Sequence, residues 1–190
     1  MQTEDTALKG VRILRPKRVN DIRGYFQESW SSAKLEEAGI NLNFVQENQS
    51  FTRSPGTVRG LHIQAPPKAQ TRLVRVLTGE VLDVAVDVRR GSPTFGRWVG
   101  VTLSAMNGRQ LLVPKGFLHG FITRHPNTTV LVKVTTAFDG TLTHRVDFAD
   151  PDIGIDWGIA PHRLMASPTD VGQPSFRDWE SPFTYAEAAA

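Results

Sequence analysis

Residues 72–89 read RLVRVLTGEVLDVAVDVR. This stretch is rich in Val and Leu and is interrupted once, by the turn signal Thr78-Gly79. It therefore predicts two short strands, 72–77 and 80–89, joined by a tight turn. Segments of the same character follow at 96–103, 109–113, 120–124, 129–136 and 143–147. Turn signals recur every roughly 8–12 residues, which is typical of an all-β sandwich or barrel rather than of βαβ units.

The N-terminal part of the chain contains one helix signal, at residues 32–38. Ser32 is a candidate N-cap, Leu35 and Ala38 give one apolar face, and Gly39 is placed to end the helix. Asp21-Ile22-Arg23-Gly24 reads as a turn. The strands predicted around these elements are 8–16, 25–30 and 44–52.

The chain has 190 residues, which is enough to bury a substantial core, and it is most simply one domain. We expect N-terminal strands within 1–57, a barrel over about 58–157, and a closing segment at 158–190. The last five residues, Ala-Glu-Ala-Ala-Ala, are expected to fray.

The composition favours a binder of small anionic molecules. The net charge is only +3, the sequence pI is about 9.5, and no run of basic residues indicates nucleic-acid binding. The chain contains no Cys, which excludes a disulfide framework and thiol chemistry. No apolar stretch approaches the roughly 20 residues of a membrane helix, and no secretory signal is evident. We therefore expect a cytoplasmic protein with no membrane and no nucleic-acid partner.

The segment Arg59-Gly60-Leu61-His62-Ile63-Gln64 places a histidine between a tight Arg-Gly turn and an alternating strand. A histidine in this setting is typical of a general base that faces into a barrel, because imidazole titrates near neutrality. The alternative interpretation of His62 is a hydrogen-bonded core residue.

Several ordered blocks of the sequence resemble the dTDP-4-dehydrorhamnose 3,5-epimerase family, and the resemblance runs nearly from end to end. The blocks are DIRGYFQE at 21–28, QENQS at 46–50, VRGLHIQ at 58–64, GEVLDVAVDVR at 79–89, GSPTFG at 91–96, VPKGFLHGF at 113–121 and DPDIGIDW at 150–157. The resemblance implies a cupin-type jelly roll, also called a double-stranded β-helix, with a few short peripheral helices. It also implies a homodimer in which N-terminal strands cross to the partner.

The resemblance implies a substrate, a nucleotide-linked (dTDP) 4-keto-6-deoxyhexose, and a reaction at C3, C5 or both. A base removes a proton next to the ketone, an enolate forms, and an acid returns a proton to the opposite face. By resemblance His62 is the base, Asp170 orients it, and Arg72 stands where the family has an enolate-stabilising Lys. Asp170 has a second interpretation as a helix cap, and Arg72 as a solvated strand residue.

Other positions depart from the family pattern. The acid tyrosine of the family aligns with Val132, and a second tyrosine aligns with Phe138. The only tyrosines in the chain are Tyr25 and Tyr185. Three further departures are Thr143 where Glu is usual, Thr169 where Lys is usual, and Trp157-Gly158 where Trp-Pro is usual.

The positions that bind the nucleotide in the family match the family pattern more closely than those around the acid tyrosine. Arginine forks suit phosphate oxygens, and a surface charge is the alternative interpretation for each Arg. His119 is expected beside the diphosphate or the sugar, or else as a buried structural histidine. The family positions that hold the nucleotide and diphosphate align with Arg23, Glu28, Gln46, Asn48 and Arg59.

Other classes of function have less support. Cupin metal sites generally use a His-x-His pair, and the chain has none, so we expect no metal and no cofactor. Gly-x-Ser-x-Gly is absent, which leaves hydrolase chemistry unsupported. Two alternatives to the epimerase stay open: a keto-sugar isomerase or another proton-transfer enzyme on the same scaffold, and a non-catalytic binder of sugar nucleotides.

Overall fold

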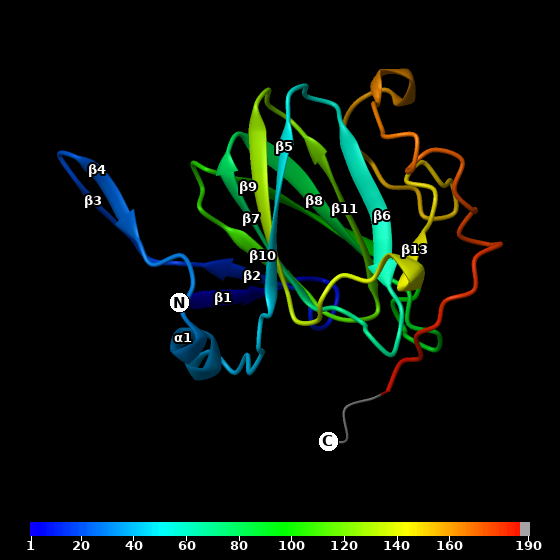
Figure 1. Ribbon diagram of the computed structural model, residues 1–190, viewed down its shortest axis with the longest axis horizontal. Helices are drawn as coiled ribbons and strands as arrows, with labels where there is room; N and C mark the ends of the chain where they lie inside the picture. The colour runs from blue at the N-terminus through cyan, green and yellow to red at the C-terminus, as the bar shows by residue number, and fades with distance from the viewer. Residues whose placement is uncertain (187–190) are drawn as a thin grey trace.

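The computed structural model describes residues 1–186 and consists of two sheets packed face to face (Figure 1). The first sheet has the strand order β1 (Gln2–Asp5), β2 (Arg12–Arg15), β10 (Gln110–Val113), β7 (Arg72–Thr78), β12 (Thr128–Val134) and β5 (Gln46–Thr52). The second has the order β13 (Thr143–Arg145), β6 (Val58–Gln64), β11 (Phe117–Thr123), β8 (Glu80–Asp87) and β9 (Trp98–Ser104). The prediction of an all-β jelly roll of the cupin type is confirmed.

Apolar side chains from both sheets meet in one core. The first sheet contributes Val74, Leu111 and Val130, and the second contributes Ala85 and Phe121; all five are at least nine-tenths buried. Full burial of a side chain the size of Val, Leu or Phe contributes about 1.5–3 kcal/mol. This core fixes the inner faces of the two sheets, and therefore fixes which side chains point into the space between them.

The outer face of the five-stranded sheet is also covered. Val84 and Val86 of β8 pack in a second apolar cluster with Ile153, Trp157 and Phe183 from the C-terminal segment. Both faces of β8 are thus buried, which explains why its sequence has consecutive apolar residues at 81–82 and 84–86 instead of strict alternation. The C-terminal segment joins the sandwich through single bridges as well, between Thr57 and Met165 and between Arg90 and Thr184.

A two-stranded hairpin, β3 (Arg18–Asp21) and β4 (Gly24–Gln27), projects away from the sandwich (Figure 1). Its register pairs Asp21 with Gly24, so Ile22 and Arg23 form a two-residue turn. Ile22 is fully exposed and Phe26 is 73% exposed. An isolated hairpin with exposed apolar side chains gains little stability from its own contacts.

The N-terminal part differs from the sequence prediction in three respects. Ser31, and not Ser32, is the N-cap of α1 (Ser32–Glu37), because its extended backbone lets the hydroxyl accept from the Lys34 amide. Strands β1 and β3 were not predicted, since both are short and polar. The barrel also begins before residue 58, because β2 and β5 belong to the six-stranded sheet.

Short 3₁₀ helices lie at η1 (Gly140–Leu142) and η2 (Pro161–Arg163). Apart from its first residue, the tail that we expected to fray lies outside the described residues. None of the helices within residues 1–186 is long and apolar enough to cross a membrane.

Candidate active site

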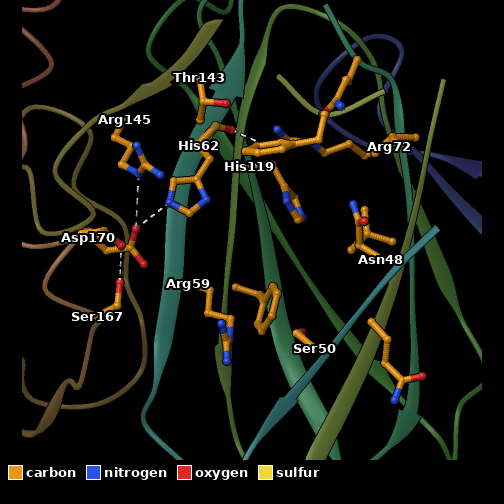
Figure 2. Close-up of a pocket in the computed structure, with 17 residues that line it drawn as sticks. Asn48, Ser50, Arg59, His62, Arg72, His119, Thr143, Arg145, Ser167 and Asp170 are labelled. Atoms are coloured by element: carbon orange, nitrogen blue, oxygen red, sulfur yellow. Dashed lines mark hydrogen bonds and ion pairs between the residues drawn. The ribbon is translucent and has the colours of Figure 1, made fainter. Parts of the chain in front are cut away.

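A cavity of about 460 Å³ opens between the two sheets and is lined by side chains from both, together with side chains from the C-terminal segment. Figure 2 shows these side chains around the cavity. The lining residues are Asn48, Gln49, Ser50, Arg59, His62, Gln70, Arg72, His119, Phe121, Val132, Val134, Phe138, Thr143, Arg145, Ser167, Thr169 and Asp170.

His62 and Asp170 are in direct contact although they are 108 residues apart in the sequence. His62 Nε2 lies 2.6 Å from Asp170 Oδ1. Asp170 follows a turn closed by its own amide, which donates to the Ser167 carbonyl at 2.9 Å. No described helix begins at this turn, so Asp170 does not act as a helix cap. The His62 side chain is 30% exposed and Asp170 is 6% exposed, so the base faces the cavity and the carboxylate lies behind it.

Asp170 is held in its ionised form. Burial by itself raises the pKa of this carboxyl, but the His62 hydrogen bond and charge, the Ser167 hydrogen bond and the charge of Arg145 together hold the pKa below its ordinary value. An ionised carboxylate behind a histidine fixes the imidazole tautomer and stabilises the imidazolium that forms when the base takes up a proton.

Arg72 reaches from β7 of the six-stranded sheet to β6 of the five-stranded sheet. Its Nη1 donates to the His62 carbonyl oxygen at 2.9 Å. Burial lowers the pKa of Arg72 to about 10, while the negative charge of Asp83 opposes that shift. The guanidinium therefore stays protonated at neutral pH and can stabilise negative charge that develops in the cavity.

A second histidine–carboxylate pair lies beside the first. His119 Nε2 is 2.6 Å from Asp83 Oδ1, and both residues are buried. The second oxygen of Asp83 is buried without a hydrogen-bond partner in the described structure. The sequence prediction included His119 and missed Asp83. The available signal was a charged residue at an inward position of a strand, between Val81 and Ala85.

Four of the five positions expected to depart from the family pattern line the cavity, on different sides of it. Val132 and Val134 line the cavity from β12, and Phe138 follows that strand. Val132 is paired with Asn48 of β5 on one side and with Val74 of β7 on the other. Thr143 and Thr169 also line the cavity. Val132 and Val134 therefore present apolar side chains to the cavity, with the polar side chain of Asn48 beside Val132.

The nucleotide residues predicted from the sequence fall into two groups. Asn48 and Arg59 line the cavity; Arg59 also spans the sheets by donating to Thr52 Oγ1 at 3.2 Å. Gln46 lies next to the cavity, where its Oε1 accepts from the Phe138 amide at 2.9 Å. Figure 2 shows Arg59 below His62, with Asn48 and Ser50 across the cavity from Asp170.

Arg23 and Glu28 are not brought to this cavity within one chain. Arg23 lies in the turn of the projecting hairpin, where it pairs with Asp21. Glu28 pairs with Lys34 of α1 at 2.7 Å. Of the described residues, no group of three or more His, Asp or Glu side chains has a metal-binding arrangement.

The cavity of this cupin-type jelly roll holds a histidine in contact with an ionised carboxylate. This arrangement is typical of proteins of this fold that carry out acid–base chemistry. The sequence matches the family model described as dTDP-4-dehydrorhamnose 3,5-epimerase over residues 5–178. The chain belongs to this family of carbohydrate isomerases.

Relatives cover nearly the whole chain. The dTDP-4-dehydrorhamnose 3,5-epimerase of Sinorhizobium fredii is 40% identical over 187 residues, which is 98% of this chain and 95% of the relative. The crystal structure of the Bacillus anthracis epimerase, with TDP and PPi bound, is 41% identical with a TM-score of 0.89, covering 92% of this chain and 99% of that chain. The Legionella pneumophila enzyme, in complex with dTDP-4-keto-L-rhamnose, is 38% identical with a TM-score of 0.91, covering 98% and 99%.

Proposed function

We propose that this protein is an epimerase of a dTDP-linked 4-keto-6-deoxyhexose and acts at C3, at C5 or at both. The observation that carries the proposal is the 2.6 Å contact between His62 and Asp170 inside a cavity of about 460 Å³. A cavity of this size suits a nucleotide sugar. The family relationship supports the same substrate class, since the relatives named above are epimerases of such sugars.

In the proposed reaction His62 removes a proton from the carbon next to the ketone. Asp170 holds the imidazole ring in place and stabilises the charge that it gains. Arg72 stabilises the negative charge on the ketone oxygen of the enolate. The nucleotide, the diphosphate and the sugar are then held by polar side chains of the cavity and its edge, namely Gln46, Asn48, Arg59 and His119. Phe138 packs against the ligand. No step of this scheme requires a cofactor.

The proton has to return to the sugar from the wall opposite His62 if the carbon is to be inverted. Val132 on that wall has no proton to give. Asn48 and Ser50 line the cavity beside it and could hold a water molecule. We propose that water, or a hydroxyl of the substrate, returns the proton there.

We also propose a homodimer in which the projecting hairpin serves the partner's cavity. Tyr25 and Phe26 are more than half exposed on the hairpin, and exposed apolar groups of this kind mark interaction surfaces. This arrangement would carry Arg23 and Glu28 to the diphosphate of the partner's ligand. Mixing His62→Ala and Arg23→Glu chains tests it, because a mixed dimer regains one complete site out of two; a mixture as inactive as either parent would contradict the arrangement.

One observation favours a second candidate, a keto-sugar isomerase. Both histidines are on the five-stranded sheet, each in contact with a carboxylate, so a proton can be removed and returned on one face of the sugar without an acid on the other. In that case C3 would lose its proton, C4 would gain one on the same face, and a proton would pass from O3 to O4, so that the carbonyl moves from C4 to C3. A cytoplasmic location stays a prediction, which cell fractionation would check.

The experiment that tests the proposal is proton NMR of dTDP-4-keto-6-deoxyglucose incubated with the protein in heavy water. Loss of the C3 or C5 proton signal, with a new sugar configuration, is the expected result. His62→Ala should abolish exchange, whereas His125→Ala, which removes an exposed histidine from a turn, should leave it unchanged. A product whose carbonyl has moved from C4 to C3 would favour the isomerase, whereas exchange without inversion would mean that the base acts and no acid acts on the opposite face. Tight dTDP binding with no exchange would favour a non-catalytic binder.

A further inference from the structure

Arg145 lies beside the dyad, which is the pair formed by His62 and Asp170. It is the last residue of β13, and its register partner is His62 on β6. Its side chain lines the cavity and is 34% exposed. Figure 2 shows interaction lines from His62, Arg145 and Ser167 converging on Asp170. Arg145 therefore approaches the carboxylate from the side of the cavity, next to the histidine that the carboxylate orients.

His62 and Arg145 approach the same oxygen atom of Asp170. His62 Nε2 is 2.6 Å from Oδ1, whereas Arg145 Nε is 3.8 Å from it. The longer distance is an ion pair but not a hydrogen bond. Arg145 Nε is buried and has no hydrogen-bond partner in the described structure. His62 thus makes the hydrogen bond to Asp170, and Arg145 adds a positive charge nearby without displacing His62 from that bond.

The charge of Arg145 acts on the dyad in two opposing ways. It stabilises the ionised form of Asp170, because opposite charges attract. It also disfavours a positive charge on His62, because like charges repel. In addition, it offsets part of the negative charge of Asp170 that would otherwise stabilise the imidazolium. A base that must be neutral to accept a proton gains from the second effect at neutral and mildly acidic pH.

We propose that Arg145 is a positioning residue that acts through Asp170, holding the carboxylate ionised while keeping His62 neutral and ready to accept a proton. This role rests on the proposed function, because it assumes that His62 is the base. Apart from Asp170 and Arg145, three charged or titratable residues of the described chain line the cavity with His62, and a fourth lies behind one of them. They are Arg72 from β7, His119 from β11 with Asp83 of β8 behind it, and Arg59 from β6.

Two readouts test the role, and one of them needs no catalysis. The first is the NMR titration of the His62 imidazole in the protein without substrate. The second is the pH dependence of solvent exchange into the 4-keto sugar. In Arg145→Gln the His62 midpoint, and with it the acidic limb of the exchange rate, should move up by about 0.5–1 pH unit. Exchange at pH 6 should fall by a few fold, and Arg145→Lys should restore the wild-type limb.

The control is Arg177→Gln, which removes an exposed arginine that pairs with Asp152, and which should leave the midpoint unchanged. If Arg145→Gln does not fold, Arg145→Met keeps the aliphatic stem and carries the same expectation. A folded variant with an unchanged His62 midpoint would overturn the proposal. If the midpoint moves but no sugar exchanges in the wild type, the role on the dyad holds and the proposed function is the part that fails.

Discussion

His62 and His119 occupy directly opposite positions on the neighbouring antiparallel strands β6 and β11. Side chains at opposite positions of such a pair point to the same face of a sheet, so both imidazoles line one wall of the cavity, each with a carboxylate at 2.6 Å. The described residues that line the cavity from β5, β7 and β12 carry no carboxyl, imidazole or phenol group. Inversion of a carbon removes a proton from one face and adds one to the other, and the described residues around Val132 offer no acid of these types for the second step.

Val132→Tyr should therefore increase inversion relative to exchange. A phenol on β12 would face His62 across the cavity and supply the missing acid, and a positioned acid contributes about 10²–10⁴-fold to a proton transfer. We expect at least about a tenfold rise in inverted sugar per exchanged proton. The measurement is proton NMR of the sugar during incubation in heavy water.

The matched control for this variant is Val132→Phe, which adds the ring without the hydroxyl. It should show no rise, because filling the cavity does not supply a proton. Equal gains in the Tyr and Phe variants would mean that packing against the sugar, and not acid catalysis, was missing from the wild-type wall.

Replacing Arg72 tests the enolate-stabilising charge. Arg72→Leu should lower the exchange rate constant by about 10²–10³-fold, since removing one group that stabilises a developing oxyanion has this effect in other enzymes. Arg72→Lys should keep most of the rate, because it keeps the charge. The affinity for dTDP, measured by calorimetry, should change little in either variant. An unchanged exchange rate in Arg72→Leu would mean that another group stabilises the negative charge of the enolate.

Much of the fold was predictable because strand signals are local. The Val- and Leu-rich runs and their Gly-containing turns placed most strands to within a few residues. Strands β1 and β3 were missed because QTED and RVND carry no apolar alternation. β1 is a strand because it pairs with β2, and β3 is a strand because it forms a hairpin with β4. Four polar residues do not indicate either pairing partner.

The site was predictable only where a motif identified its residues. His62, Arg72 and His119 each lie within a segment that indicates their position, whereas Asp83 and Arg145 become site residues through strand pairing. Arg145 reaches the dyad because β13 pairs with β6 in a register that sets it opposite His62. A local sequence pattern does not contain that register. The contact of Asp170 with His62 likewise depends on how the C-terminal segment folds back.

Gly60 allows the close approach of the two histidine strands. Its φ is +132°, and a Cβ added there would lie 2.6 Å from Gly120 Cα and 2.9 Å from the His119 carbonyl oxygen. Gly60→Ala should lower the free energy of unfolding by about 1–3 kcal/mol for the backbone conformation alone, and by more because of the clash. Denaturant unfolding measures this loss.

Gly24→Ala provides the comparison, because Gly24 has a φ of +124°, close to that of Gly60, and nothing within 4 Å of an added Cβ. It isolates the cost of the backbone conformation. The difference between the two variants therefore reports the clash between β6 and β11. Equal losses would mean that the strands can move apart at no cost, and that Gly60 does not hold the histidines in place.

The depressed pKa of Asp170 makes a prediction about acid stability. Burial opposes the shift, but the contacts with His62, Ser167 and Arg145 hold the folded-state pKa below the ordinary value of 3.8. The unfolded chain therefore takes up the proton first as the pH falls. The stabilisation is complete well above pH 3.8, and it is lost as the pH falls through the folded-state value.

Asp170→Asn should thus have a lower Tm than the wild type at pH 7, by about 2–4 °C for each kcal/mol lost. The gap should close as the pH falls below 3.8, because the wild type then loses the same stabilisation. Asp178→Asn, on the exposed surface, should follow the wild-type curve. Thermal melts between pH 7 and pH 2.5 make the comparison. A gap that stays constant across this range would mean that the Asp170 charge contributes nothing to folding, and that only its hydrogen bonds matter.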